Sequence, residues 1–114
     1  MSVQFNSFRD QAGNAAYAPQ FTSDNYNVQL AESIAQSLTV PSNFNQWVAV
    51  FSFDPGLRIF VANNTTATVP GSSFAQSASQ LNPGARVVNA GDVLSFITPD
   101  VSAFITVSFY AKPF

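Results

Sequence analysis

Cysteine and histidine are absent from this chain of 114 residues, and charged residues make up only 9% of it. The chain therefore has no thiol nucleophile, disulfide or imidazole base, and it lacks the usual ligands of structural zinc. Its four basic residues are scattered singly, so we expect no binding to a phosphate backbone and no nucleic-acid partner. No apolar run approaches the roughly 18 residues that a membrane helix needs. The first residues do not resemble a signal peptide, so we expect synthesis in the cytoplasm and no membrane contact.

Six carboxylates remain as candidates for acid–base chemistry. Asp54 and Asp100 lie beside turn prolines, where Asp caps a turn by bonding backbone N–H groups, and Asp92 lies at the start of an expected strand. The other three acids lie in or near residues 1–27, and we interpret all six as turn or surface residues. The sequence has no Asp-x-Asp cluster for calcium, no Gly-x-Ser-x-Gly elbow and no glycine-rich phosphate loop. We therefore predict no catalytic residue, no metal site and no cofactor, and we do not expect an enzyme.

Hydrophobic residues make up 46% of the chain, and from residue 28 onward they follow a β pattern. The run QWVAVFSF (46–53) is apolar on both faces, which predicts a central strand covered on both sides. We expect Trp47 to pack in the core and not to form a sugar-binding platform. The sequence DPG (54–56) predicts a tight turn, and with the returning run LRIFVA (57–62) it predicts a β-hairpin. A strand is expected over 34–40, with a short helix over 28–37 as the alternative.

About twenty residues between the runs ending at 62 and starting at 86 are rich in Asn, Thr, Ser, Gln and Ala and almost uncharged. This stretch predicts a long surface connection that crosses the fold as in a Greek key, with Phe74 and Leu81 as possible anchors. Turn signals recur every 8 to 12 residues and separate seven or eight expected strands. The chain is thus predicted to be all-β, with one antiparallel β-sandwich of jelly-roll or Greek-key type over 28–114.

Residues 1–27 form a different segment, in which irregularly spaced aromatic residues lie among amides. Neither a helical nor a strand period fits these residues, and a disordered tail would contain fewer aromatics. We interpret the segment as an extended N-terminal arm that anchors either on its own domain or on a neighbouring chain. The expected partner contacts are Phe5, Phe8, Arg9 and Tyr17, because aromatic rings fill pockets and Arg bonds carboxylates or carbonyls.

The order of segments between about residues 38 and 111 resembles the small β-sandwich virion proteins of tailed bacteriophages, which include capsid decoration or cement proteins. The segments are LTVP, WVAVFSF, LRIFVANNTTATVPG, SASQLNPGARVVNAGDVLSFITP and ITVSFYA. Within them the resemblance rests on a Val-Pro strand end, an LNP-R element (Leu81, Asn82, Pro83 and Arg86) and a closing FYA strand. The N-terminal arm matches no pattern of that family, so no capsid contact is carried over to individual residues.

The resemblance implies a jelly-roll-like, homo-oligomeric protein, a dimer or a trimer, on the outer surface of a phage capsid. It would bind the major capsid protein, stabilise contacts between capsomers and assemble in the host cytoplasm. Low charge and many amides suit such a large contact, because few charges must be desolvated when it forms. The alternative is a head-fibre or tail-associated binding module that contacts host glycans. An exposed aromatic beside an amide or carboxylate side chain within residues 63–86 would favour that alternative.

Overall fold

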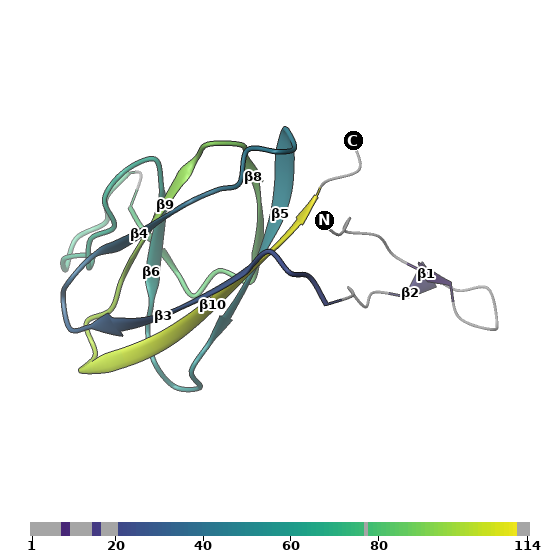
Figure 1. The fold of residues 1–114 in the computed structure, drawn as a ribbon. Coiled ribbons are helices and arrows are strands. Elements are labelled where there is room, and N and C mark those ends of the chain that lie inside the picture. The colour runs from purple at the N-terminus through teal and green to yellow at the C-terminus, as the bar shows by residue number, and fades with distance from the viewer. Residues whose placement is uncertain (1–7, 10–14, 17–20, 77, 112–114) are drawn as a thin grey trace.

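The computed structural model describes residues 8–9, 15–16, 21–76 and 78–111, and these residues form strands, turns and loops but no helix. None of them therefore forms a helix that could span a membrane. Eight of the strands form two four-stranded antiparallel sheets that pack together (Figure 1). The strands are β1 (Phe8–Arg9), β2 (Ala15–Ala16), β3 (Asn25–Ala31), β4 (Gln36–Thr39), β5 (Gln46–Phe53), β6 (Phe60–Asn63), β7 (Gln80–Leu81), β8 (Ala85–Asn89), β9 (Val93–Ile97) and β10 (Ser102–Ala111).

The strand order defines a jelly roll. One sheet has the order β3-β10-β5-β8 and the other has the order β4-β9-β6-β7. Successive strands change sheet, except β6 and β7, which are neighbours in the second sheet, and this double Greek key is the jelly-roll arrangement of eight strands. The prediction of an all-β antiparallel sandwich of this type is confirmed, and the short helix considered over 28–37 is replaced by β3 and β4.

The predicted hairpin between 46–53 and 57–62 is wrong, although the turn within it is correct. Leu57 N–H donates to the carbonyl of Asp54 at 3.4 Å, and Gly56 has the positive φ of 78° that the third residue of such a turn requires. After the turn the chain crosses to the other sheet, because β5 pairs with β10 and β8 whereas β6 pairs with β9 and β7. The turn residues determine that the chain reverses, but burial decides which sheet the next strand joins. Both strands have apolar inner faces, which are covered when the strands lie in opposite sheets.

The polar connection over 64–79 also differs from its prediction. It joins β6 to β7, which are antiparallel neighbours with Phe60 opposite Leu81, so it is a long loop within one sheet and not a crossing connection. Phe74 and Leu81 are both exposed and do not anchor it. The buried anchor is Ala67, which packs with Phe60 and Ile97 at the side of the main core. Periodicity could not reveal this contact, since a single small residue in a polar stretch carries no pattern.

The main core lies between the sheets and is built by residues that alternate along the strands. Trp47 is completely buried, as predicted, and its indole N–H donates to the carbonyl of Pro41 at 2.8 Å. Its ring makes edge contacts with Phe44 and Phe109. On the outer face of β5 the side chains are half-buried or exposed, so the prediction that both faces of this strand are covered is wrong.

The junction between the N-terminal segment and the sandwich lies along β10. The Thr22 hydroxyl donates to the carbonyl of Phe109 at 3.0 Å, and Phe109 N–H donates to the carbonyl of Asp24 at 2.8 Å. Strand β3 then pairs with β10 from Asn25 onward. The first contacts with the sandwich therefore precede residue 28, from which the β pattern was predicted.

Candidate functional site

The short ribbon β1–β2 lies within the N-terminal arm, of which residues 21–27 next to the sandwich are also described. Its two strands pair antiparallel, with Phe8 opposite Ala16 and Arg9 opposite Ala15. Figure 1 shows the ribbon apart from both four-stranded sheets, and it forms a separate two-stranded sheet. Two of the predicted partner contacts, Phe8 and Arg9, thus lie together on β1. The other two, Phe5 and Tyr17, lie outside the described residues.

The long loop over 64–79 is the second candidate for an interaction surface. Two serine hydroxyls hold its ends: Ser95 accepts from Ala67 N–H at 2.9 Å, and Ser79 accepts from Thr68 N–H at 3.1 Å. The first of these hydrogen bonds is buried, so water does not readily compete for it. The loop therefore starts from a fixed point beside β9.

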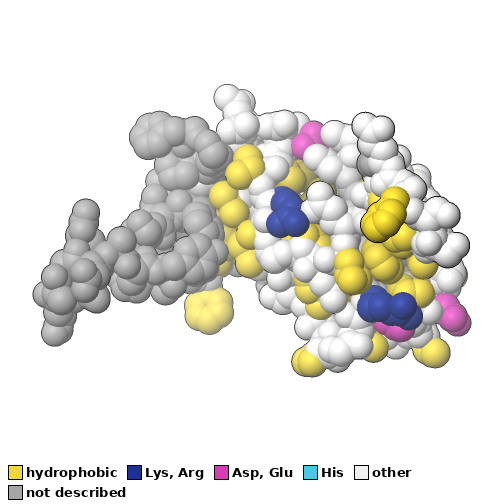
Figure 2. Space-filling model, turned by 180° about the vertical axis from the view of Figure 1, so that it is seen from behind, with side chains coloured by type: hydrophobic (Ala, Val, Ile, Leu, Met, Phe, Trp, Pro, Cys, Tyr) yellow, Lys and Arg dark blue, Asp and Glu magenta, His cyan; other side chains and the backbone are white. Residues whose placement is uncertain are grey.

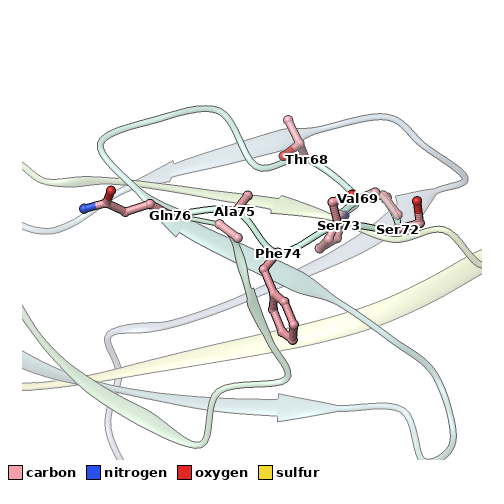
Figure 3. A pocket seen from close by; sticks show the side chains of 10 residues that line it. Thr68, Val69, Ser72, Ser73, Phe74, Ala75 and Gln76 are labelled. Carbon is pink, nitrogen blue, oxygen red and sulfur yellow. The ribbon is translucent and has the colours of Figure 1, made fainter.

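Between its ends, the loop surrounds an open hollow of ≈ 520 Å³ (Figure 3). Residues Thr68 to Gln76 and Ala78 line it, and none of these described residues is charged. Phe74 is fully exposed, with a relative accessibility of 109%. Figure 3 shows that the Phe74 ring and the Gln76 amide extend in different directions from the loop. The loop thus exposes the aromatic ring of Phe74, but this ring and the Gln76 amide do not converge on a single binding position.

Asn82 secures the return of this loop to the sandwich. Its side-chain oxygen accepts from Ile59 N–H at 2.7 Å, and its side-chain amide donates to the carbonyl of Leu57 at 3.0 Å. Its own backbone N–H donates to the carbonyl of Ile59 at 2.9 Å. With a φ of 43°, Asn82 adopts the left-handed conformation that Asn tolerates better than most residues. Asn82, the Asn of the LNP-R element, therefore bonds the backbone of Leu57 and Ile59, which precede β6 and have no strand partner there among the described residues.

Asp54 and Asp100 accept hydrogen bonds from backbone N–H groups, as predicted, but these groups belong to distant segments and not to the turns beside their prolines. Asp54 accepts from Phe104 N–H at 2.8 Å. Asp100 accepts from the backbone N–H of Arg58 at 2.8 Å and from its guanidinium at 3.2 Å. The backbone hydrogen bond, followed by that of the guanidinium and its charge, lowers the pKa of Asp100. These contacts tie the β5–β6 connection to the turn before β10.

Asp92 joins three asparagines at the start of β9. It accepts from Asn89 N–H at 2.9 Å, from the Asn64 amide at 3.0 Å and from the Asn63 amide at 3.1 Å. The hydrogen bond from Asn89 contributes most to lowering the pKa of Asp92, and the two side-chain amides lower it further. Asn64 has a positive φ of 60° and also accepts from Val93 N–H through its side chain. The Asn63–Asn64 pair is thus a turn that closes the sandwich beside β9.

The described surface combines few charges with many exposed apolar side chains. Figure 2 shows uncharged side chains over most of one face, with small separate groups of basic, acidic and hydrophobic side chains among them. The large hydrophobic residues that are exposed are Phe21, Tyr26, Ile34, Phe44, Val69, Phe74, Leu81, Val87, Val93, Val101 and Phe104. They come from both sheets and from several loops.

Comparison with known proteins adds no relative: no protein family matches the chain, and neither curated protein sequences nor solved structures gave a match.

The sequence had indicated the arm and the polar loop as the two unusual segments. It had not identified Ala67 or the full exposure of Phe74, because both depend on how the loop folds back on β9. The sequence also did not show that β3 is the edge strand of its sheet among the described residues, since strand order is decided by pairing between distant segments.

Proposed function

We propose that this chain is a structural virion protein, a decoration or cement protein on the outer surface of a tailed-phage head. The observation that carries the proposal is the β1–β2 ribbon apart from the sandwich. An isolated two-stranded ribbon is marginally stable in water, so it gains stability when it lies on another surface. The jelly roll is compatible with this role, because viral capsid domains use it, although a fold alone does not decide function.

The proposed partner is the major capsid protein, and the protein would act by burying surface across capsomer boundaries. Its low charge favours this, since few ionic groups lose their hydration when the contact forms. An oligomer carries several arms, and binding of one arm raises the effective concentration of the next at a neighbouring capsomer. Modest affinity for each arm then suffices for a firm attachment.

The test is co-sedimentation with phage heads that lack the protein, followed by measurement of their heat resistance. The full chain is expected to bind and to raise the temperature at which the heads open. Replacement of Phe5, Phe8 and Tyr17 by Ser should abolish binding, whereas the control Phe74→Ser should bind like the original chain. The proposal is wrong if the full chain does not bind, or if the arm variant binds as well as the control.

The exposed Phe74 favours a second candidate, a head-fibre or tail-associated module that contacts host glycans. An aromatic face can stack on a sugar ring, and jelly rolls also occur in lectins. The Gln76 amide extends in a different direction from the ring, so one sugar would contact Phe74 without this amide. For this reason we rank the glycan role second.

Titration of host-surface glycans against Phe74→Ala and Phe21→Ala separates the two roles. Phe21 is equally exposed, at 102%, but lies outside the loop, so its variant controls for the loss of an exposed ring. Glycan binding that only Phe74→Ala removes would support the second candidate. Equal binding by both variants would exclude Phe74 as the site.

A further inference from the structure

Strand β3 is an edge strand whose outer side pairs with no other strand in the described part of the chain. It pairs with β10 on its other side, in continuous register from Asn25 to Ala31. Figure 1 shows it lying along β10 at the border of its sheet. An edge exposes a row of backbone N–H and C=O groups, and natural proteins usually protect it with charges, proline, bulges or a short strand. None of the seven residues of β3 is charged or proline, and its register has no bulge.

The other three edges of the sandwich are better protected. β4 has four residues and β7 has only two, so each offers few backbone groups. β8 has five residues and carries Arg86, whose side chain crosses to Gln80 at 2.9 Å. Strand β3 is therefore the longest edge and the one without a protecting feature.

Residues 26–30 of β3 are complementary to themselves when they are read antiparallel about Val28. Asn27 then lies opposite Gln29 of a second copy, and Tyr26 lies opposite Leu30. In these central pairs amides meet amides on the outer face and Tyr26 meets Leu30 on the inner face. At the ends of the strand Asn25 lies opposite Ala31, and beyond it Asp24 lies opposite Glu32. Such a pattern fits the twofold symmetry of an isologous dimer.

We propose that β3 pairs antiparallel with β3 of a second copy, which joins the two four-stranded sheets into one sheet of eight strands. A hollow of ≈ 230 Å³ between β3 and β4 supports this occupant. All its lining residues are uncharged, and Val28, Leu38, Phe96 and Val107 form its apolar part. In the proposed register, the Val28 side chain of the second copy lies at the mouth of this hollow and covers it.

The dimer goes beyond the proposed function, because it concerns the protein alone and requires no capsid. Each dimer would then carry two N-terminal arms, one from each of its two symmetry-related sandwiches. The dimer is measured in the absence of phage heads. A monomeric result would therefore refute the β3 pairing without deciding whether the protein binds heads.

The first test uses matched charge variants and sedimentation equilibrium of the full chain. In the variant Asn27→Lys with Gln29→Lys, like charges oppose each other twice in each dimer. In the variant Asn27→Lys with Gln29→Glu, opposite charges meet at the same two positions. The first variant should dissociate about tenfold more readily than the second, because cross-strand pairs of like charge are destabilising. Both variants lose the same hydrogen bond from Thr106 to Asn27, so that loss cancels in the comparison.

The second test uses single cysteines, which is possible because the chain contains none. Residues directly opposite each other in an antiparallel pair have Cβ atoms about 4.5–5.5 Å apart, near the separation that a disulfide requires. Val28→Cys should therefore form a disulfide-linked dimer under mild oxidation much faster than Val87→Cys, on the exposed edge strand β8. A monomeric full chain, equal dissociation of the two charge variants or equal cross-linking of the two cysteine variants would each overturn the pairing.

Discussion

Asn82 provides the sharpest test of how the polar loop is held to the sandwich. Ile59 is completely buried, and its N–H donates to the Asn82 side chain at 2.7 Å. Replacement of Asn82 by Ala leaves this N–H without a partner, which costs about 1–3 kcal/mol. Ala at a φ of 43° adds about 1 kcal/mol of backbone strain. We therefore expect Asn82→Ala to lower the free energy of unfolding by about 2–4 kcal/mol.

Urea denaturation, followed through the fluorescence of Trp47, measures this change directly. A loss of about 2–4 kcal/mol corresponds to a fall in Tm of about 8–16 °C for a domain of this size. The variant Asn82→Gly separates the two contributions, because Gly tolerates the left-handed backbone but also loses the side-chain hydrogen bonds. It should be destabilised less than Asn82→Ala. A change below about 0.5 kcal/mol for Asn82→Ala would refute the reasoning, since it would mean that Ile59 N–H needs no acceptor.

Three further predictions concern turns and anchors. Gly56→Ala should cost about 1 kcal/mol in unfolding free energy because of its positive φ, whereas Gly71→Ala, which also meets open space, should be nearly neutral in the same denaturation assay. The pKa of Asp92 is lowered in the folded state from the ordinary value of 3.8. Its contribution to stability is therefore present above pH 3.8 and is lost as the pH falls below that value. In a plot of Tm against pH, Asp92→Asn should accordingly flatten the decline on the acid side. Ser95→Ala should leave the Ala67 N–H unpaired, cost about 1–3 kcal/mol and speed cleavage of the polar loop in limited proteolysis.

The two proposed interactions use different parts of the chain. The arm is proposed to contact the capsid, whereas β3 is proposed to contact a second copy. The variant Asn27→Lys with Gln29→Lys should therefore shift the protein from dimer to monomer in solution while leaving the predicted partner contacts of the arm, Phe5, Phe8, Arg9 and Tyr17, unchanged. If the dimer forms, the variant Asn27→Lys with Gln29→Lys should also attach more weakly to heads, because a monomer binds through one arm and loses the gain in effective concentration.

Period-2 alternation and turn chemistry were sufficient to predict the class of fold. The run from Trp47 to Phe53 alternates as a strand must, and Asp54, Pro55 and Gly56 carry the residue preferences of their turn. The burial of Trp47 followed from its position in the most apolar strand. These properties depend on neighbours in the sequence, so they can be read locally.

Strand pairing was not readable in this way. The turn at residues 54–56 leads from one sheet to the other, and the loop over 64–79 stays within one sheet, both contrary to prediction. Each outcome depends on contacts between segments far apart in the chain, such as Phe51 with Val107 across β5 and β10. The period-2 alternation of a strand specifies which of its side chains face the core. The same side chains would face the core in either sheet, so the pattern does not specify the sheet.

The sequence by itself thus determined that the chain is all-β, where most of its strands lie and which side chains of the central strands are buried. Only the tertiary structure decided the strand order within each sheet, the place of β3 at the edge of the described sheet and the exposure of Phe74. The physical reason is that backbone preferences and alternation act between neighbouring residues, whereas the choice of strand partners is made by burial of the whole apolar surface at once.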